Sequence, residues 1–239
     1  MTRPEPIASG SPLYDLNRTA DIALEHNVPE ASDLAFDASN GALWTVSDSN
    51  GTIYSIGTDG RSVAAPMKTA ARDLEGIAID PTSGHLFVVD EAASRVTELT
   101  RAGAVVGGFA VDVPPGGAGL EGIAYDPQTD GFVLVRERNP AELLFVDRSG
   151  RITSRARVAT EDLSAVTVIP GSPNVLAVAR FEEAVLELDR SGKRINRMPI
   201  DIPGVEGLAL DGNGRMFLIT DRGSRAESTL YVFSRGGGR

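Results

Sequence analysis

The chain has 239 residues, of which 41% are hydrophobic and 23% charged, which is ordinary for a folded protein and excludes disorder along the whole chain. Its 33 acidic and 23 basic residues give a formal net charge of −10, which makes nucleic acids and anionic lipid surfaces poor partners. The absence of cysteine excludes disulfides, iron–sulfur clusters and cysteine-ligated zinc.

The N-terminal residues 1–15 lack the apolar stretch of a signal peptide. No apolar run in the chain approaches the roughly 20 residues that a bilayer-spanning helix needs. We therefore expect no membrane span, and a cytoplasmic protein if Met1 is the native start. If a signal segment has been removed, the expected location is the cell envelope or the outside of the cell.

One phrase occurs five times: ASDLAFD (31–37), DLEGIAID (73–80), GLEGIAYD (119–126), DLSAVTVI (162–169) and GVEGLALD (204–211). We call one place in it the Glu position, which holds in turn Ser32, Glu75, Glu121, Ser164 and Glu206. These residues are separated by 43, 46, 43 and 42 positions. Such a period is typical of a propeller blade of ~40 to 45 residues with four strands.

The segments between the copies also favour strands. A Gly, Pro, Asn or Asp turn follows each phrase, then two further β-rich runs, a second turn and an apolar stretch. The fifth unit reaches only its third strand, at 229–233, and residues 16–26 can supply the missing one. Because this pairing joins the two ends of the chain, it would close a ring and protect its edges.

We therefore predict an all-β, five-bladed β-propeller of four-stranded blades in which an N-terminal strand closes the last blade. Residues 1–15 would form an N-terminal tail, residues 16–235 a single propeller domain and residues 236–239 a C-terminal tail. A closed monomer is favoured over two alternatives, a six- or seven-bladed ring assembled from two chains and a flat β-solenoid.

The repeat also predicts where polar side chains meet. In an antiparallel hairpin the start of the first strand lies beside the end of the second, so the Glu positions and the second-strand ends should share one mouth of the channel. The mouth would then contain carboxylates and two neighbouring arginines: Asp48, Glu75, Glu91, Glu121, Glu137, Glu206, Asp221, Arg136 and Arg180.

So many acidic groups at close quarters need bases, raised pKa values or a cation to compensate them. Oxygen ligands suit a hard divalent ion, with calcium as the first choice and magnesium as the alternative. We predict Glu75, Glu121 and Glu206 as metal ligands because they share one register. The expected ligand-binding residues are Asp48, Glu91, Glu137, Arg136, Arg180 and Asp221. In a purely structural alternative, the glutamates accept backbone N–H groups or pair with arginines.

The chain offers few residues for histidine-based catalysis, because it contains only His26 and His85. A Ser-His-acid triad would have one weak candidate base, and a histidine-rich zinc site has no ligands. No catalytic residue is therefore assigned from the sequence.

On its repeated motifs the chain resembles the SdiA-regulated family of bacterial β-propellers. The resemblance rests on LEGIAYD (120–126) and its echo at 74–80, on SDLAFD (32–37) and on RERNPAELLFV (136–146), and extends over about residues 20–234. It implies a propeller of this blade type without an established activity. A looser similarity links the chain to calcium-dependent lactonase-like and phytase-like propellers, where mouth carboxylates hold the metal.

Two functions stay open at this point. The favoured one is a non-enzymatic propeller that binds a divalent cation, and a small ligand or protein partner, at the acidic mouth. The alternative is a metal-dependent hydrolase of a phosphate ester, ester or lactone that uses the same mouth. The scarcity of histidine favours the first function, and the acidic cluster fits the second.

Overall fold

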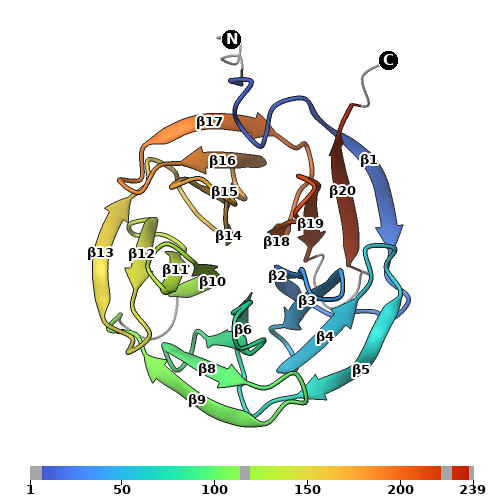
Figure 1. The fold of residues 1–239 in the computed structure, drawn as a ribbon, viewed down its shortest axis with the longest axis vertical. Coiled ribbons are helices and arrows are strands. Elements are labelled where there is room, and N and C mark those ends of the chain that lie inside the picture. The colour runs from blue at the N-terminus through green and yellow to red at the C-terminus, as the bar shows by residue number, and fades with distance from the viewer. Residues whose placement is uncertain (1–6, 114–118, 222–227, 237–239) are drawn as a thin grey trace.

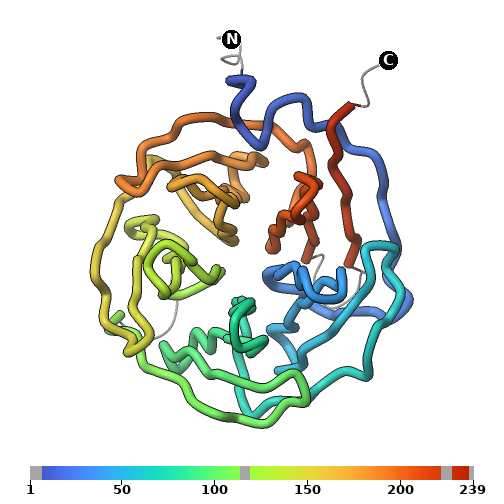
Figure 2. The backbone as a smooth tube through the Cα atoms, in the orientation of Figure 1, coloured from blue at the N-terminus to red at the C-terminus, as the bar shows by residue number. Residues whose placement is uncertain are grey.

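The computed structural model describes residues 7–113, 119–221 and 228–236. Within them the chain forms five antiparallel sheets of four strands each, which stand as blades around a central channel (Figure 1). The backbone travels once around this channel, so that neighbouring blades are also consecutive in the sequence (Figure 2). In the described segments, no helix has the length and hydropathy needed to cross a bilayer. The all-β, five-bladed propeller predicted from the repeat period is confirmed.

Every blade begins with its innermost strand and ends at the outer rim of the ring (Figure 1). Blade one consists of β2 (Ala31–Asp37), β3 (Ala42–Ser47), β4 (Thr52–Ile56) and β5 (Ser62–Lys68), and blade two of β6 (Leu74–Ile79), β7 (Leu86–Asp90), β8 (Arg95–Leu99) and β9 (Val105–Ala110). Blade three consists of β10 (Leu120–Asp126), β11 (Gly131–Arg136), β12 (Glu142–Val146) and β13 (Ile152–Arg157). Blade four consists of β14 (Ala165–Val168), β15 (Val175–Ala179), β16 (Ala184–Leu188) and β17 (Arg194–Pro199).

Blade five is assembled from both ends of the chain, as the sequence predicts. It contains β18 (Val205–Leu210), β19 (Met216–Thr220) and β20 (Thr229–Arg235), and its outermost strand is β1 (Leu16–Ala23). Strands β1 and β20 pair antiparallel, from Leu16 opposite Arg235 to Ala23 opposite Thr229. The ring is therefore closed by backbone hydrogen bonds between segments more than 200 residues apart.

The hydrophobic core lies between the blades. Each of its clusters of buried side chains joins one sheet to the next, and aliphatic residues supply most of the contacts. The interface of blades two and three adds Phe87 and Phe132, whose ring centroids are 4.6 Å apart. Because each blade buries its two faces against its neighbours, no single blade could keep its apolar surface from water alone.

The segment before β1 also packs against the ring. The Leu13 side chain is 1% exposed and joins the core between blades four and five. The Ser11 hydroxyl donates a hydrogen bond of 2.6 Å to Oε2 of Glu187 in blade four. The N-terminal segment thus fastens blade four to blade five, in addition to the strand pairing of β1.

Arginine and aspartate residues link consecutive blades at the turns after the innermost strands. Each link joins an arginine that follows the third strand of one blade to the aspartate at or just after the end of the first strand of the preceding blade. The pairs and their nitrogen–oxygen distances are Arg101–Asp37 at 2.5 Å, Arg148–Asp80 at 2.8 Å and Arg190–Asp126 at 2.5 Å. Because these aspartates are at most 3% exposed, the links hold the blades in a fixed relation at the end of the channel opposite the Glu positions.

Removal of residues 1–23 should abolish cooperative unfolding. Without β1 the backbone edge of β20 is exposed, and the β1–β20 pairing that joins the two ends of the chain is lost. Chemical unfolding followed by circular dichroism tests this expectation, and a synthetic peptide covering residues 10–26 should restore the transition. A truncated chain that unfolds cooperatively at the wild-type midpoint would contradict the role of β1.

Candidate functional site

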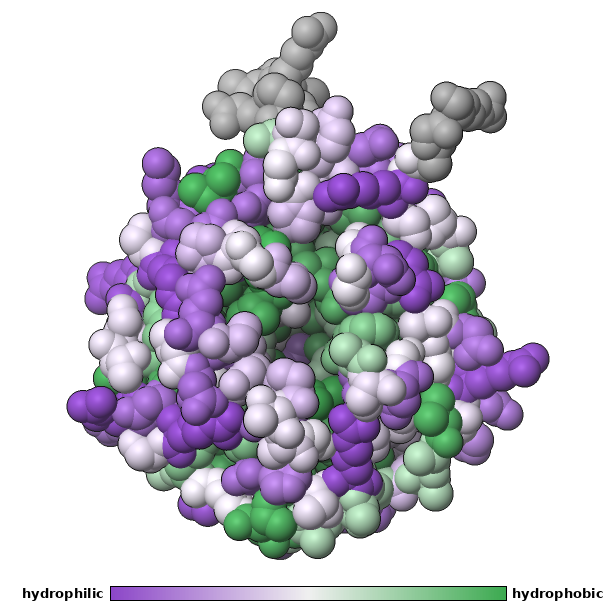
Figure 3. All heavy atoms as spheres, viewed as in Figure 1, coloured by the Kyte–Doolittle hydropathy of each residue, from purple (hydrophilic) through white to green (hydrophobic). Residues whose placement is uncertain are grey.

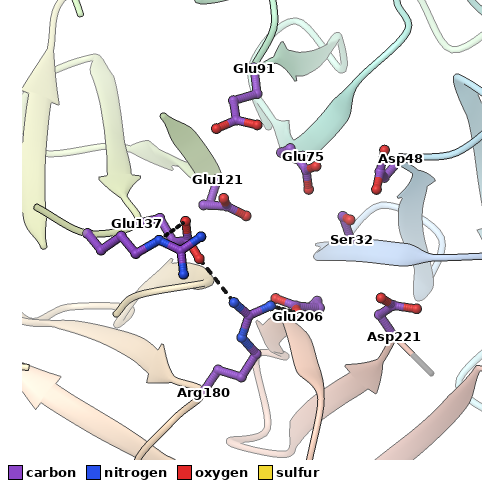
Figure 4. A pocket seen from close by; sticks show the side chains of 10 residues that line it. Ser32, Asp48, Glu75, Glu91, Glu121, Glu137, Arg180, Glu206 and Asp221 are labelled. Atoms are coloured by element: carbon purple, nitrogen blue, oxygen red, sulfur yellow. Dashed lines mark hydrogen bonds and ion pairs between the residues drawn. The ribbon is translucent and has the colours of Figure 1, made fainter. Parts of the chain in front are cut away.

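A cavity of about 260 Å³ opens at one mouth of the channel. The blades follow one another clockwise in Figure 1 and anticlockwise in Figure 4, so Figure 4 looks into this mouth from the opposite side of the ring. The cavity is lined almost entirely by charged side chains: Ser32, Asp48, Glu75, Glu91, Glu121, Glu137, Arg138, Arg180, Glu206 and Asp221. The structure thus brings together every site residue expected from the sequence except Arg136.

The glutamates enter the cavity because of bulges in the innermost hairpins. In blade two, Leu74 is opposite Asp90 and Gly76 is opposite Val89, so Glu75 is an extra residue between two paired ones. Glu206 occupies the same position in blade five. A β-bulge redirects the side chain of its extra residue, which here turns toward the channel. Blade four has Ser164 and Ala165 at this point, and its hairpin shows no register shift.

Arg180 neutralises the half of the cavity formed by blades three, four and five. It extends from the end of β15 and lies beside Glu137 and Glu206 (Figure 4). Its guanidinium forms ion pairs with Glu137 at 3.0 Å, with Glu206, and with Asp162 at 3.6 Å. Arg138 pairs with Glu137 at 3.0 Å from the other side. Blade four lacks an acidic residue at the Glu position, and its arginine instead joins the acids of its two neighbours.

Within residues 7–113, 119–221 and 228–236, the half formed by blades one and two contains no arginine in a position like that of Arg180. Asp48, Asp73 and Glu75 each place a carboxylate oxygen within 4.8 Å of the others. Among the described residues, none of the three forms an ion pair with an arginine or lysine. Glu91 stands nearby, where its Oε1 accepts a hydrogen bond of 2.7 Å from the Gly119 N–H. Negative groups are therefore crowded on this side, and the Asp48, Asp73 and Glu75 carboxylates have no arginine or lysine ion pair within the part of the chain that the structure describes.

The pKa values of these carboxyls respond to the crowding. Burial, and then the charge of Asp48, raise the pKa of Glu75 to about 9. Burial also raises the pKa of Glu121 well above its usual range, with Glu75 and Glu137 adding repulsion. The pKa of Glu206 rises only to about 7, because Arg180 opposes the effect of burial. Burial and the neighbouring Asp73 raise the pKa of Asp48 to about 6. In the absence of a cation, protons therefore compensate part of the negative charge.

The structure also shows what the sequence did not reveal. Arg136 is not among the described residues that line the cavity; it donates a hydrogen bond of 3.4 Å to Oε2 of Glu142. Asp73 was not expected, although it precedes Glu75 by two residues, and such residues share one side of a strand. Arg138 was also missed as a lining residue. It lies two residues after Arg136, in the turn between β11 and β12.

The opposite face of the ring differs from this mouth. A hollow at the centre of that face is surrounded by apolar as well as polar residues (Figure 3). The cavity lined by carboxylates at the other end of the channel is therefore the candidate functional site.

Comparison with known proteins agrees with this architecture. A family model described as SdiA-regulated matches residues 16–222. Among solved structures, virginiamycin B lyase from Staphylococcus aureus has a TM-score of 0.54 at 14% identity, and the match covers 89% of this chain and 69% of that one. A chain of the nidogen/laminin complex has a TM-score of 0.58 at 17% identity, with 81% and 73% covered. A protein of unknown function from Bacteroides caccae gives 0.56 at 16% identity, with 79% and 69% covered. At these identities the likeness shows the fold alone.

Replacement of Arg180 by methionine should destabilise the protein by about 3 kcal/mol or more at pH 8, because Glu137, Asp162 and Glu206 would lose their shared cation. The loss should shrink toward pH 5, where Glu206 takes up a proton. Urea unfolding at the two pH values measures both effects. Arg138→Met is the control, since Arg138 is 41% exposed and its pair should contribute about 1 kcal/mol or less. Equal effects of the two substitutions would contradict the central place of Arg180.

Proposed function

This chain belongs to the SdiA-regulated family, and we propose that it binds a divalent cation, calcium first, at the acidic channel mouth without being an enzyme. The bound cation would in turn help to hold a small ligand or a protein partner at that face. The observation that supports this proposal is the group of Asp48, Asp73 and Glu75, whose carboxylates approach one another without a basic partner among the described residues.

The chemistry of these side chains favours a hard cation. Three carboxylates offer only oxygen donors, which calcium and magnesium prefer over nitrogen or sulfur donors. Calcium accepts six to eight oxygens in irregular arrangements, whereas magnesium requires a compact octahedron. The cavity is wide enough to leave room for water molecules, and Ser32 offers a hydroxyl beside Glu75. An irregular, partly hydrated site of this kind suits calcium better.

The ligands that we propose from the structure differ from the three glutamates predicted from the sequence, Glu75, Glu121 and Glu206. Glu75 is common to both, and Glu121 lines the same cavity and could approach the ion. Glu206 is engaged by Arg180, so its carboxylate is less available. We therefore propose Asp48, Asp73 and Glu75 as the main ligands, with Glu121, which lines the same cavity, as a further contributor.

The proposal is tested by Glu75→Gln, which keeps the size of the side chain and removes its charge. The variant should bind calcium at least about tenfold more weakly, since affinity depends on the number of charged ligands. In chelator near neutral pH it should be about as stable as the wild type, because the raised pKa of Glu75, about 9, already keeps this side chain neutral there. Thermal melts with calcium and with chelator, together with calorimetric titration of calcium, measure both quantities.

Glu206→Gln is the matched control for this experiment. It occupies the same register in blade five but is engaged by Arg180 and lies outside the proposed ligand set, so it should weaken calcium binding much less than Glu75→Gln does. Wild-type melts that coincide with and without calcium would refute the cation site. Equal destabilisation of Glu75→Gln in both buffers would assign Glu75 a structural role instead.

Stability of the metal-free protein should fall as pH rises from about 5 to about 9. The pKa values of Asp48, Glu206 and Glu75 in the folded state, about 6, 7 and 9, lie above their ordinary values of 3.8 and 4.5. The folded chain therefore holds these protons more tightly than the unfolded chain, and loses the associated stability as they dissociate. Urea unfolding in chelator between pH 5 and 9 measures the decline.

Calcium should reverse this trend, because it competes with protons for the same carboxylates. A cation that binds only the folded state at a hundredfold excess over Kd raises stability by about 2.7 kcal/mol. The gain should be present at pH 8 and nearly absent at pH 5. A calcium effect independent of pH would place the ion away from these carboxyls.

A metal-dependent hydrolase is the second candidate function. The pKa of Glu206 near 7 favours it, because a carboxyl that titrates near neutral pH can act as a general base beside a metal-bound water. A panel of phosphate esters, carboxylate esters and lactones, assayed with and without calcium, separates the two functions. Turnover that disappears in Glu206→Gln and in chelator would support the hydrolase, and no turnover on any substrate would support the binding function.

A further inference from the structure

Asp33 occupies a position where three of the other blades have glycine. It follows the Glu position of blade one, in register with Gly76, Gly122 and Gly207. Its side chain is fully buried, with an exposed fraction of 0%, and its φ of 54° lies in the left-handed region. A buried aspartate in such a backbone conformation costs free energy, so its contacts must compensate that cost.

The carboxylate of Asp33 spans three blades. Its Oδ2 accepts hydrogen bonds of 3.1 Å from the N–H of Ile77 in blade two and of 3.1 Å from the N–H of Ile123 in blade three. Its Oδ1 accepts a bond of 2.8 Å from the N–H of Leu34 in its own blade. One side chain therefore joins the innermost strands β2, β6 and β10 at the centre of the ring.

The two inter-blade bonds fall close to the mouth glutamates. Ile77 lies two residues after Glu75, and Ile123 lies two residues after Glu121. The backbone of Asp33 is itself held in place: the Thr45 hydroxyl donates 2.8 Å to its carbonyl oxygen, and Gly207 of blade five packs against it. A Cβ at Gly207 would lie 2.6 Å from the Asp33 carbonyl carbon.

We propose that Asp33 is a positioning residue for the cation site. Its bonds to Ile77 and Ile123 fix the two bulges that carry Glu75 and Glu121, and so set the separation of these carboxylates in the cavity. The neighbouring Ser32 lines the same cavity, so the Ser32–Asp33 pair of blade one stands where blades two, three and five have a Glu–Gly pair. This inference rests on the proposed function, because it assigns Asp33 a role in the geometry of the proposed site.

Asp33→Asn tests this inference, since it keeps the size of the side chain but leaves one acceptor oxygen for three N–H donors. Its calcium Kd, measured by titration calorimetry well below the melting temperature, should rise by about threefold to tenfold. Asp126→Asn is the matched control. Asp126 is 1% exposed, accepts the Gln128 N–H at 3.1 Å and ends the strand that carries Glu121, but it lies at the other end of the channel. Its substitution should lower stability while leaving Kd unchanged.

Hydrogen exchange of the wild type provides a second measurement that does not depend on any variant. Calcium should slow the exchange of the Ile77 and Ile123 amides more than that of the other amides in β6 and β10. Equal changes along both strands, or equal rises in Kd for Asp33→Asn and Asp126→Asn, would overturn the positioning role.

The cation site and the positioning role of Asp33 can fail independently of each other. If the wild type binds neither calcium nor magnesium, the cation proposal fails. The positioning of Glu75 and Glu121 is then read from their side-chain carboxyl ¹³C shifts in the metal-free protein. Asp33→Asn should change these shifts and Asp126→Asn should not; unchanged shifts in Asp33→Asn would overturn the inference.

Discussion

The innermost strands of neighbouring blades approach one another so closely that most side chains would not fit between them. A Cβ at Gly76 would lie 2.5 Å from the carbonyl oxygen of Glu121, and one at Gly122 would lie 2.8 Å from the Cα of Ala165. Real Cβ atoms do not approach so near, so blades two and three require glycine at this position for their innermost strands to pack as closely as they do. The residue before each of these glycines lies in the bulge, and its side chain turns into the channel.

The accumulation of acid at the mouth follows from this geometry. Repetition of one bulge around an axis brings identical side chains to the same height, and repeated glutamates then repel one another in a partly buried space. The chain relieves this repulsion differently on the two sides. Arg180 supplies an internal cation for Glu137 of blade three and Glu206 of blade five, whereas the raised pKa values of Glu75 and Glu121 favour their neutral, protonated forms.

The sequence could predict those features that repeat. The period predicted the blades, the missing last strand predicted the closure by β1, and the shared register placed Glu75 and Glu121 at one mouth. Features that occur once could not be predicted in the same way. The burial of Leu13 between blades four and five depends on where the N-terminal segment runs. The hydrogen bonds of Asp33 depend on the distance across the channel, which no single blade encodes.

The two sides of the mouth also differ in what holds the blades together. Arg180 of blade four joins Glu137 of blade three to Glu206 of blade five, so it links three consecutive blades by charge. The proposed cation would link Asp48 of blade one to Asp73 and Glu75 of blade two in the same manner. Both the observed link and the proposed one depend on the packing of neighbouring blades, because their members come from different blades. A cation at this mouth would therefore stabilise the propeller as well as mark its binding face, and occupancy of the site would report on the integrity of the ring.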